Sequence, residues 1–116
     1  MLRLRYARTI RAYVTLNVRR VVILSDNARK QVDLLLEKLP SRIFFASLPL
    51  GEPESIIAVE PKRVEVILFY NPKTSMIYVV SPRKFKVKAG RESSIALVPA
   101  KLIDKEQLYT LLVLQS

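Results

Sequence analysis

The stretch VEVILFYNPKTSMIYVV, residues 64–80, decides the fold class that the sequence predicts. Its two ends are apolar and rich in β-branched and aromatic residues, as is typical of buried strands. Between them, NPKTS (71–75) has a proline at the second position of a turn, where the fixed backbone angle of proline is favourable. The stretch therefore predicts a hairpin of strands 64–70 and 76–80.

Strand patterns continue on both sides of this hairpin. Short apolar runs occur in RRVVIL (19–24), RIFFASL (42–48), SIIAV (55–59) and SIALV (94–98). KFKVK (84–88) alternates lysine with Phe85 and Val87, and a period of two predicts a strand with one exposed and one buried face.

The N-terminal residues 2–18 alternate in the same way. Even-numbered positions are apolar from Leu2 to Val18 except for Arg8, and odd-numbered positions are mostly polar. This pattern predicts one long strand with its even-numbered side chains buried and a bulge or bend at Arg8.

One helix is expected in SDNARKQVDLLLEKLP (25–40). Its apolar residues follow the helical period and form one stripe, made of Ala28, Val32, Leu35, Leu36 and Leu39. Ser25 or Asp26 is expected to cap its N-terminus, and Pro40 ends it.

The C-terminal stretch is ambiguous. DKEQ (104–107) resembles a capping box, while LYTLLVL (108–114) fits either a short helix or a buried strand. Because the run has no polar helix face, we favour the strand. The whole pattern predicts a single α+β domain over residues 1–116, with a mainly antiparallel sheet and one principal helix, about 26–39, packed on one face.

Composition excludes many kinds of chemistry. Without Cys or His, the chain has no disulfide, no thiolate or imidazole metal ligand and no imidazole base. Gly51 and Gly90 are the only glycines, so no glycine-rich phosphate loop is present. We expect no catalytic residue, cofactor or metal site. Few glycines and seven prolines are typical of a thermophile. Arginines interrupt the first twenty residues, so we expect no signal peptide, a cytoplasmic protein and no membrane partner.

The positive charge is the main indication of function. The net charge is +10, and residues 1–30 and 62–91 each contribute +7. If the strands at 1–18 and 84–88 share a sheet face, their outward side chains form one basic surface that favours nucleic acid. The candidate binding residues are Arg3, Arg5, Arg8, Arg11, Tyr13, Arg19, Arg83, Lys84, Lys86 and Lys88. RNA or single-stranded DNA is favoured, because the helix is too apolar and too weakly basic to read a major groove.

Two alternatives stay open. Lysines on an edge strand also prevent edge-to-edge aggregation, which would make the basic charge a background property. The chain could instead be an accessory subunit of a larger assembly, such as a polymerase, a ribonucleoprotein or a filament system, or a small homo-oligomeric structural protein. A protein partner or a second copy would then bind apolar residues in the loop and at the C-terminus, namely Leu48, Leu50, Leu112 and Leu114.

Overall fold

The computed structural model describes residues 4–50, 55–91 and 94–114. Its strands are β1 (Leu4–Ala7), β2 (Ala12–Thr15), β3 (Val18–Ile23), β4 (Arg42–Pro49), β5 (Ser55–Glu60), β6 (Val66–Asn71), β7 (Met76–Ser81), β8 (Lys86–Arg91), β9 (Ser94–Pro99) and β10 (Lys101–Asp104). Its helices are α1 (Arg29–Glu37) and α2 (Lys105–Tyr109), and α2 continues into a π-helical segment, η1 (Thr110–Leu114).

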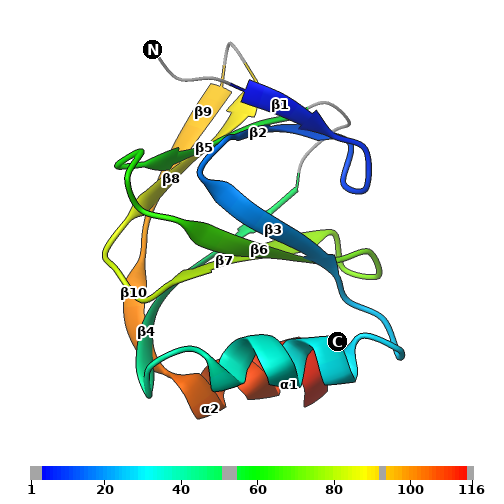
Figure 1. The fold of residues 1–116 in the computed structure, drawn as a ribbon. Helices are drawn as coiled ribbons and strands as arrows, with labels where there is room; N and C mark the ends of the chain where they lie inside the picture. Colours follow the sequence, from blue (N-terminus) through cyan, green and yellow to red (C-terminus); the bar gives the residue numbers. More distant parts are fainter. Residues whose placement is uncertain (1–3, 51–54, 92–93, 115–116) are drawn as a thin grey trace.

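These elements form three layers (Figure 1). The outer sheet has the strand order β1-β2-β5-β8-β9, and the central sheet has the order β10-β4-β7-β6-β3. The helices lie on the far side of the central sheet. The central sheet is therefore covered on both faces, whereas the outer sheet packs on its neighbour with one face only.

Both sheets are mixed, for one topological reason. The chain passes from the outer to the central sheet between β2 and β3, and again between β5 and β6. As a result β2 and β5 run parallel, and so do β3 and β6, while the other pairs are antiparallel. Strands β9 and β10 are separated only by Ala100, so they carry the chain almost directly from one sheet to the other.

Each layer boundary has its own apolar core. Between the sheets, Val14, Ile57 and Val87 of the outer sheet pack with Leu68 and Val79 of the central sheet. The second core lies between the central sheet and the helices and contains Phe69, Val80, Val32, Leu36, Leu108 and Leu112. Burial on both faces explains why β4, β6 and β7 are nearly continuous apolar runs rather than alternating ones.

Several local predictions are confirmed. The hairpin at 64–80 exists as β6 and β7, and the runs at 42–48, 55–59 and 94–98 are strands. Phe85 and Val87 are buried between exposed lysines. The predicted helical stripe faces the second core, and Gln107 Oε1 accepts a 3.2 Å hydrogen bond from the Asp104 backbone N–H in the expected capping box.

Other predictions are wrong. The N-terminal stretch is not one long strand, because residues 8–11 form a turn between β1 and β2. The N-cap of α1 is Ala28 without a side-chain hydrogen bond, rather than Ser25 or Asp26. Residues 108–114 are helical rather than extended, since Leu108 and Leu112 pack in the core between the central sheet and α1. The predicted sheet-rich α+β class is observed, but the single sheet with one principal helix is not, because the chain forms two mixed sheets and two short helices.

Asn17 forms hydrogen bonds between two of the connections that carry the chain from the outer sheet to the central sheet. Asn17, in the turn between β2 and β3, donates from Nδ2 to the backbone oxygens of Val59 at 3.2 Å and Val64 at 3.0 Å. Its Oδ1 accepts a hydrogen bond from the Thr15 hydroxyl, and its backbone oxygen accepts one from the Val66 N–H at 3.2 Å. Asn17 therefore holds the β2–β3 turn against the β5–β6 turn.

Within the described ranges, no helix is long and apolar enough to cross a membrane.

Candidate nucleic-acid interface

The solvent-facing side of the outer sheet is the candidate site, and we call it the open face. Strand register defines it, because side chains alternate and Val14, Ile57 and Val87 point into the core. Its residues are Leu4, Tyr6, Tyr13, Ile56, Ala58, Glu60, Lys86, Lys88, Gly90, Ile95, Leu97 and Pro99. The N-terminal strands β1 and β2 and the strand β8 thus belong to one sheet, which was the condition for a shared basic surface.

Two tyrosines form an exposed aromatic pair on this face. Tyr6 and Tyr13 lie opposite each other on β1 and β2, with ring centroids 4.9 Å apart and ring planes inclined by 57°. Their exposed fractions are 37% and 38%, so part of each ring is available to a ligand. A flat aromatic surface that reaches solvent is the feature on which bases stack in single-strand binding proteins.

Gly90 is a position on the open face that carries no side chain. Register puts it in the same row as Tyr13 and Ile56 on one side and Ile95 on the other. Its φ of 143° is a conformation that other residues rarely adopt, and a Cβ here would lie 2.0 Å from the Ser94 backbone oxygen. Backbone geometry therefore requires glycine, so the row carries the Ile56 side chain next to the tyrosines and no side chain between Ile56 and Ile95.

Lys86 and Lys88 point out of β8 on either side of one carboxylate. Lys88 Nζ lies 3.1 Å from Glu60 Oε1, and Lys86 Nζ lies 4.0 Å from Glu60 Oε2. Both lysine side chains are about half exposed, so water screens these ion pairs. Two ammonium groups share one carboxylate, which leaves a net positive charge at this end of the face.

Arg8 and Arg11 supply positive charge at the opposite end of the aromatic pair. They lie in the β1–β2 turn, which closes through a hydrogen bond from the Ile10 N–H to the Ala7 oxygen and a left-handed Arg11 with φ of 53°. Ile10 is buried and anchors the turn to the core, while both arginines are exposed. Positively charged residues therefore lie beyond one end of the Tyr6–Tyr13 pair and, two strands away on β8, beyond its other end.

The remaining predicted binding residues lie elsewhere. Arg5 alternates with Tyr6, so it belongs to the other side of edge strand β1. Arg19 lies in the central sheet, with Nη1 4.0 Å from Glu65 Oε2. Arg83 and Lys84 are exposed in the turn before β8, and Arg3 is outside the described residues. The open face thus contains Tyr13, Lys86 and Lys88 from the predicted set, with Arg8 and Arg11 at its end.

Sequence reasoning missed the apolar character of the open face. It assigned Tyr6 and Leu4 to the buried side, because it treated residues 2–18 as one strand. It also missed Ile95 and Leu97, which are 63% and 55% exposed on β9. The alternation of SIALVP was the available signal, but both of its faces are apolar, so periodicity could not tell which side is exposed.

The alternative interface residues are not on this surface. Leu48 and Leu112 are buried in the two cores, and Leu50 is half-buried against the core between the sheets. The side chain of Leu114 lies outside the described residues. Leu48, Leu50 and Leu112 contribute to the interior rather than to a surface open to a partner.

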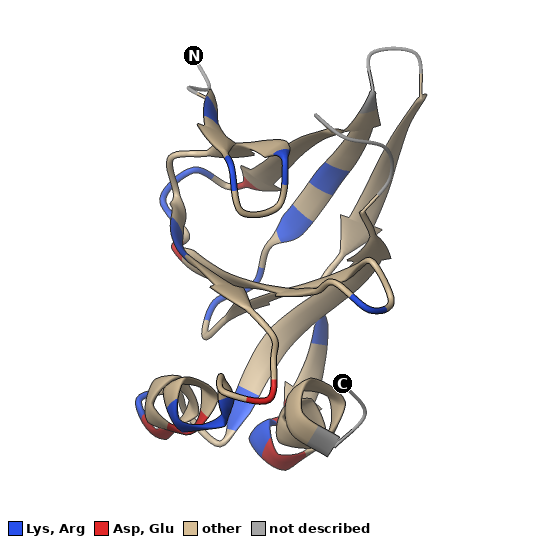
Figure 2. Ribbon diagram, turned by 90° about the vertical axis from the view of Figure 1, so that its right-hand side faces the viewer, with Lys and Arg blue, Asp and Glu red and all other residues tan. Residues whose placement is uncertain are grey.

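Positive charge is concentrated away from the helices (Figure 2). Among the described residues, the helical layer and its flanking turns (24–41 and 105–113) contain four basic and four acidic residues. Residues 4–23, 42–50, 55–90 and 94–104, which form the sheets and their connections, contain fourteen basic residues and three acids, Glu60, Glu65 and Asp104. The sheets therefore hold nearly all of the excess positive charge.

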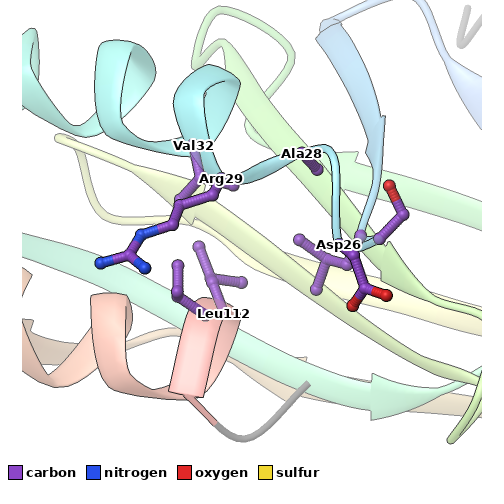
Figure 3. Close-up of a pocket in the computed structure, with 8 residues that line it drawn as sticks. Asp26, Ala28, Arg29, Val32 and Leu112 are labelled. Atoms are coloured by element: carbon purple, nitrogen blue, oxygen red, sulfur yellow. The ribbon is translucent and has the colours of Figure 1, made fainter.

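In the part of the chain that the structure describes, no group of three Asp or Glu side chains is placed to hold a metal ion. A cavity of about 200 Å³ between the start of α1 and the C-terminal helical segment is lined by Asp26 and Arg29 (Figure 3). The charged ends of these two residues lie on opposite sides of Leu112 and do not converge.

Comparison with protein-family models, with curated proteins and with solved structures found no match.

Proposed function

We propose that the open face binds single-stranded nucleic acid, RNA or single-stranded DNA, without catalysing a reaction. The observation that carries this proposal is the exposed Tyr6–Tyr13 pair with cations on both sides of it. Bases stack on exposed aromatic rings with little sequence preference, and neighbouring Lys and Arg neutralise phosphates. The two kinds of contact that a single strand needs occur together on this face.

Strand spacing suggests how a ligand would lie. Neighbouring strands are about 4.8 Å apart and residues rise about 3.4 Å, so Lys88 is roughly 12 Å from Tyr13 across the sheet. We expect a single-stranded nucleic acid to run from the β1–β2 turn toward β8. Its phosphates would then lie near Arg8 and Arg11 at one end and near Lys86 and Lys88 at the other, with bases over the tyrosines between them. Glu60 would oppose this binding, and its pairing with the lysines would weaken when phosphates replace it.

The first test is the salt dependence of binding. Four phosphate contacts predict a slope of about −3 for the logarithm of the binding constant against the logarithm of salt concentration. Fluorescence anisotropy of labelled single-stranded RNA and DNA measures this slope. Lys86→Gln with Lys88→Gln should make the slope shallower by about 1 to 1.5.

The matched control removes two charges from the opposite layer. Arg29→Gln with Lys30→Gln on α1 changes the net charge equally but lies away from the open face. This control should leave the slope close to that of the wild-type protein. Absence of binding at low salt, or equal effects of the two double variants, would contradict the proposal.

Stacking is tested by a second prediction. Tyr6→Ala and Tyr13→Ala should each weaken binding about tenfold, because stacking on an aromatic ring contributes about 1–3 kcal/mol per base. Tyr6→Phe and Tyr13→Phe keep the ring and should bind within a factor of about two. Thermal unfolding of each variant checks that the fold is intact. Loss of binding in the Phe variants as well would assign the effect to the hydroxyl groups rather than to stacking.

A second candidate function rests on a different part of the same face. Ile95 and Leu97 expose more than half of their surface, and exposed apolar clusters favour protein partners. This fits the accessory-subunit alternative, with β9 rather than the buried leucines as the contact. Flat anisotropy in the salt series would make this candidate the preferred one.

A further inference from the structure

We infer that a cavity between α1 and the central sheet binds a small amphipathic anion, that is, a carboxylate or phosphate group attached to an apolar body. The cavity has a volume of about 250 Å³ and lies where α1 ends, β3 and β6 begin and β7 ends. It is separate from the open face, because it lies on the helical side of the central sheet.

The floor and walls of this cavity are apolar. Leu35 and Leu39 come from the helical segment, Ile67 and Val80 come from neighbouring strands of the central sheet, and Pro82 follows β7. The cavity exists because α1 ends at Glu37, about 13 Å from its start, and Pro40 prevents it from continuing over the sheet. An apolar ligand body here would take the place of the side chains that a longer helix would supply.

The rim of the cavity is basic. Arg19, Arg20 and Lys38 line it together with one acid, Glu65. In a regular strand, Arg19 and Arg20 would point to opposite faces. Here a register shift between Val18 and Arg20 interrupts the pairing of β3 with β6, so consecutive arginines line the same cavity.

Only one of these cations is compensated. Arg19 lies 4.0 Å from Glu65, whereas no carboxylate of the described residues lies within 4.0 Å of Arg20 or Lys38. An arginine fork and an ammonium group that line an apolar cavity are complementary to an oxyanion. The charge therefore selects an anionic head, and the leucines select an apolar body.

Size restricts the ligand further. Ligand pockets usually have about 300–1,000 Å³, so a cavity of about 250 Å³ takes a small molecule rather than a long lipid chain or a folded partner. Octanoate and phenyl phosphate represent the carboxylate and phosphate classes. Acetate and inorganic phosphate carry the charge without the body, and 1-octanol carries the body without the charge.

The experiment is an NMR titration of the isotope-labelled protein with each of these probes. Octanoate or phenyl phosphate should shift the signals of Leu39, Ile67 and Val80 in a saturable way, and the tighter of the two identifies the head group. Acetate, inorganic phosphate and 1-octanol should bind at least about tenfold more weakly, because each lacks one of the two recognised parts.

Substitutions of the exposed basic residues that line the cavity test ligand binding without changing the apolar core. Arg20→Gln and Lys38→Gln should each weaken octanoate or phenyl phosphate binding about tenfold, since each removes one charge-assisted contact. Both residues are exposed, so the fold is retained, and Arg29→Gln with Lys30→Gln on the same helix should leave binding unchanged. Equal binding of 1-octanol and octanoate, no shifts in the cavity, or unchanged binding in the rim variants would overturn the inference.

Discussion

Phe69→Ala is expected to lower the free energy of unfolding by about 4 kcal/mol, because it removes a buried aromatic ring and leaves a cavity that the surrounding layers cannot close. Phe69 is fully buried in β6 and belongs to the core between the central sheet and the helices. Its neighbours in register are Val22 on one side and Tyr78 on the other, so strands on both sides lose contact with it.

Urea unfolding followed by circular dichroism measures this loss. Leu34→Ala is the matched control, since Leu34 is on the exposed face of α1 and its truncation should change stability by less than about 0.5 kcal/mol. A loss below about 2 kcal/mol for Phe69→Ala would mean that the helices can move inward and fill the space. That result would contradict the rigid three-layer packing.

Asn17→Asp is the second substitution with a large expected effect, about 3 kcal/mol of destabilisation at neutral pH. The change replaces an amide that donates to the Val59 and Val64 oxygens with a carboxylate that can only accept. Two hydrogen bonds are lost, and negative charge is placed against two carbonyl oxygens. The turns that connect the two sheets would then repel each other at this point.

The effect of Asn17→Asp should depend on pH in a defined direction. The carbonyl oxygens disfavour the charged form, so the pKa of the introduced carboxyl is raised in the folded state. A raised pKa means that the variant is least destabilised below the unfolded pKa of about 3.9 and loses stability as pH rises through the folded value. Asn27→Asp, in the exposed turn before α1, makes the same chemical change without these acceptors and should have little effect. Equal destabilisation by both variants at every pH would contradict the role given to Asn17.

Individual helices and turns could be predicted where the sequence has a clear local pattern, such as turn-forming residues or a helical apolar stripe. Proline and asparagine in NPKTS fix the β6–β7 hairpin, and the leucine stripe fixes α1. The β1–β2 turn was missed because RTIR contains no glycine, proline or asparagine, and Arg11 adopts the left-handed conformation that glycine usually supplies. The helical end of the chain was missed because its side chains are surrounded by apolar neighbours and show no polar face.

Long-range pairing was not predictable from local patterns. The parallel contacts of β2 with β5 and of β3 with β6 join segments more than forty residues apart, and nothing in either segment specifies its partner. The candidate site was therefore predicted only in part. The lysines and Tyr13 follow from alternation, whereas Tyr6 and Glu60 join them through pairing that only the folded chain provides.

Because the chain passes repeatedly between the two sheets, it cannot be divided into fragments that each contain one complete sheet. The described strands pass between the outer and central sheets five times, so each sheet is assembled from non-contiguous pieces of the chain. A cut anywhere between β3 and β9 leaves strands of both sheets on each fragment and divides both cores. Neither sheet is a module that could be excised, fused or exchanged on its own, and the chain is expected to fold and unfold as one cooperative unit.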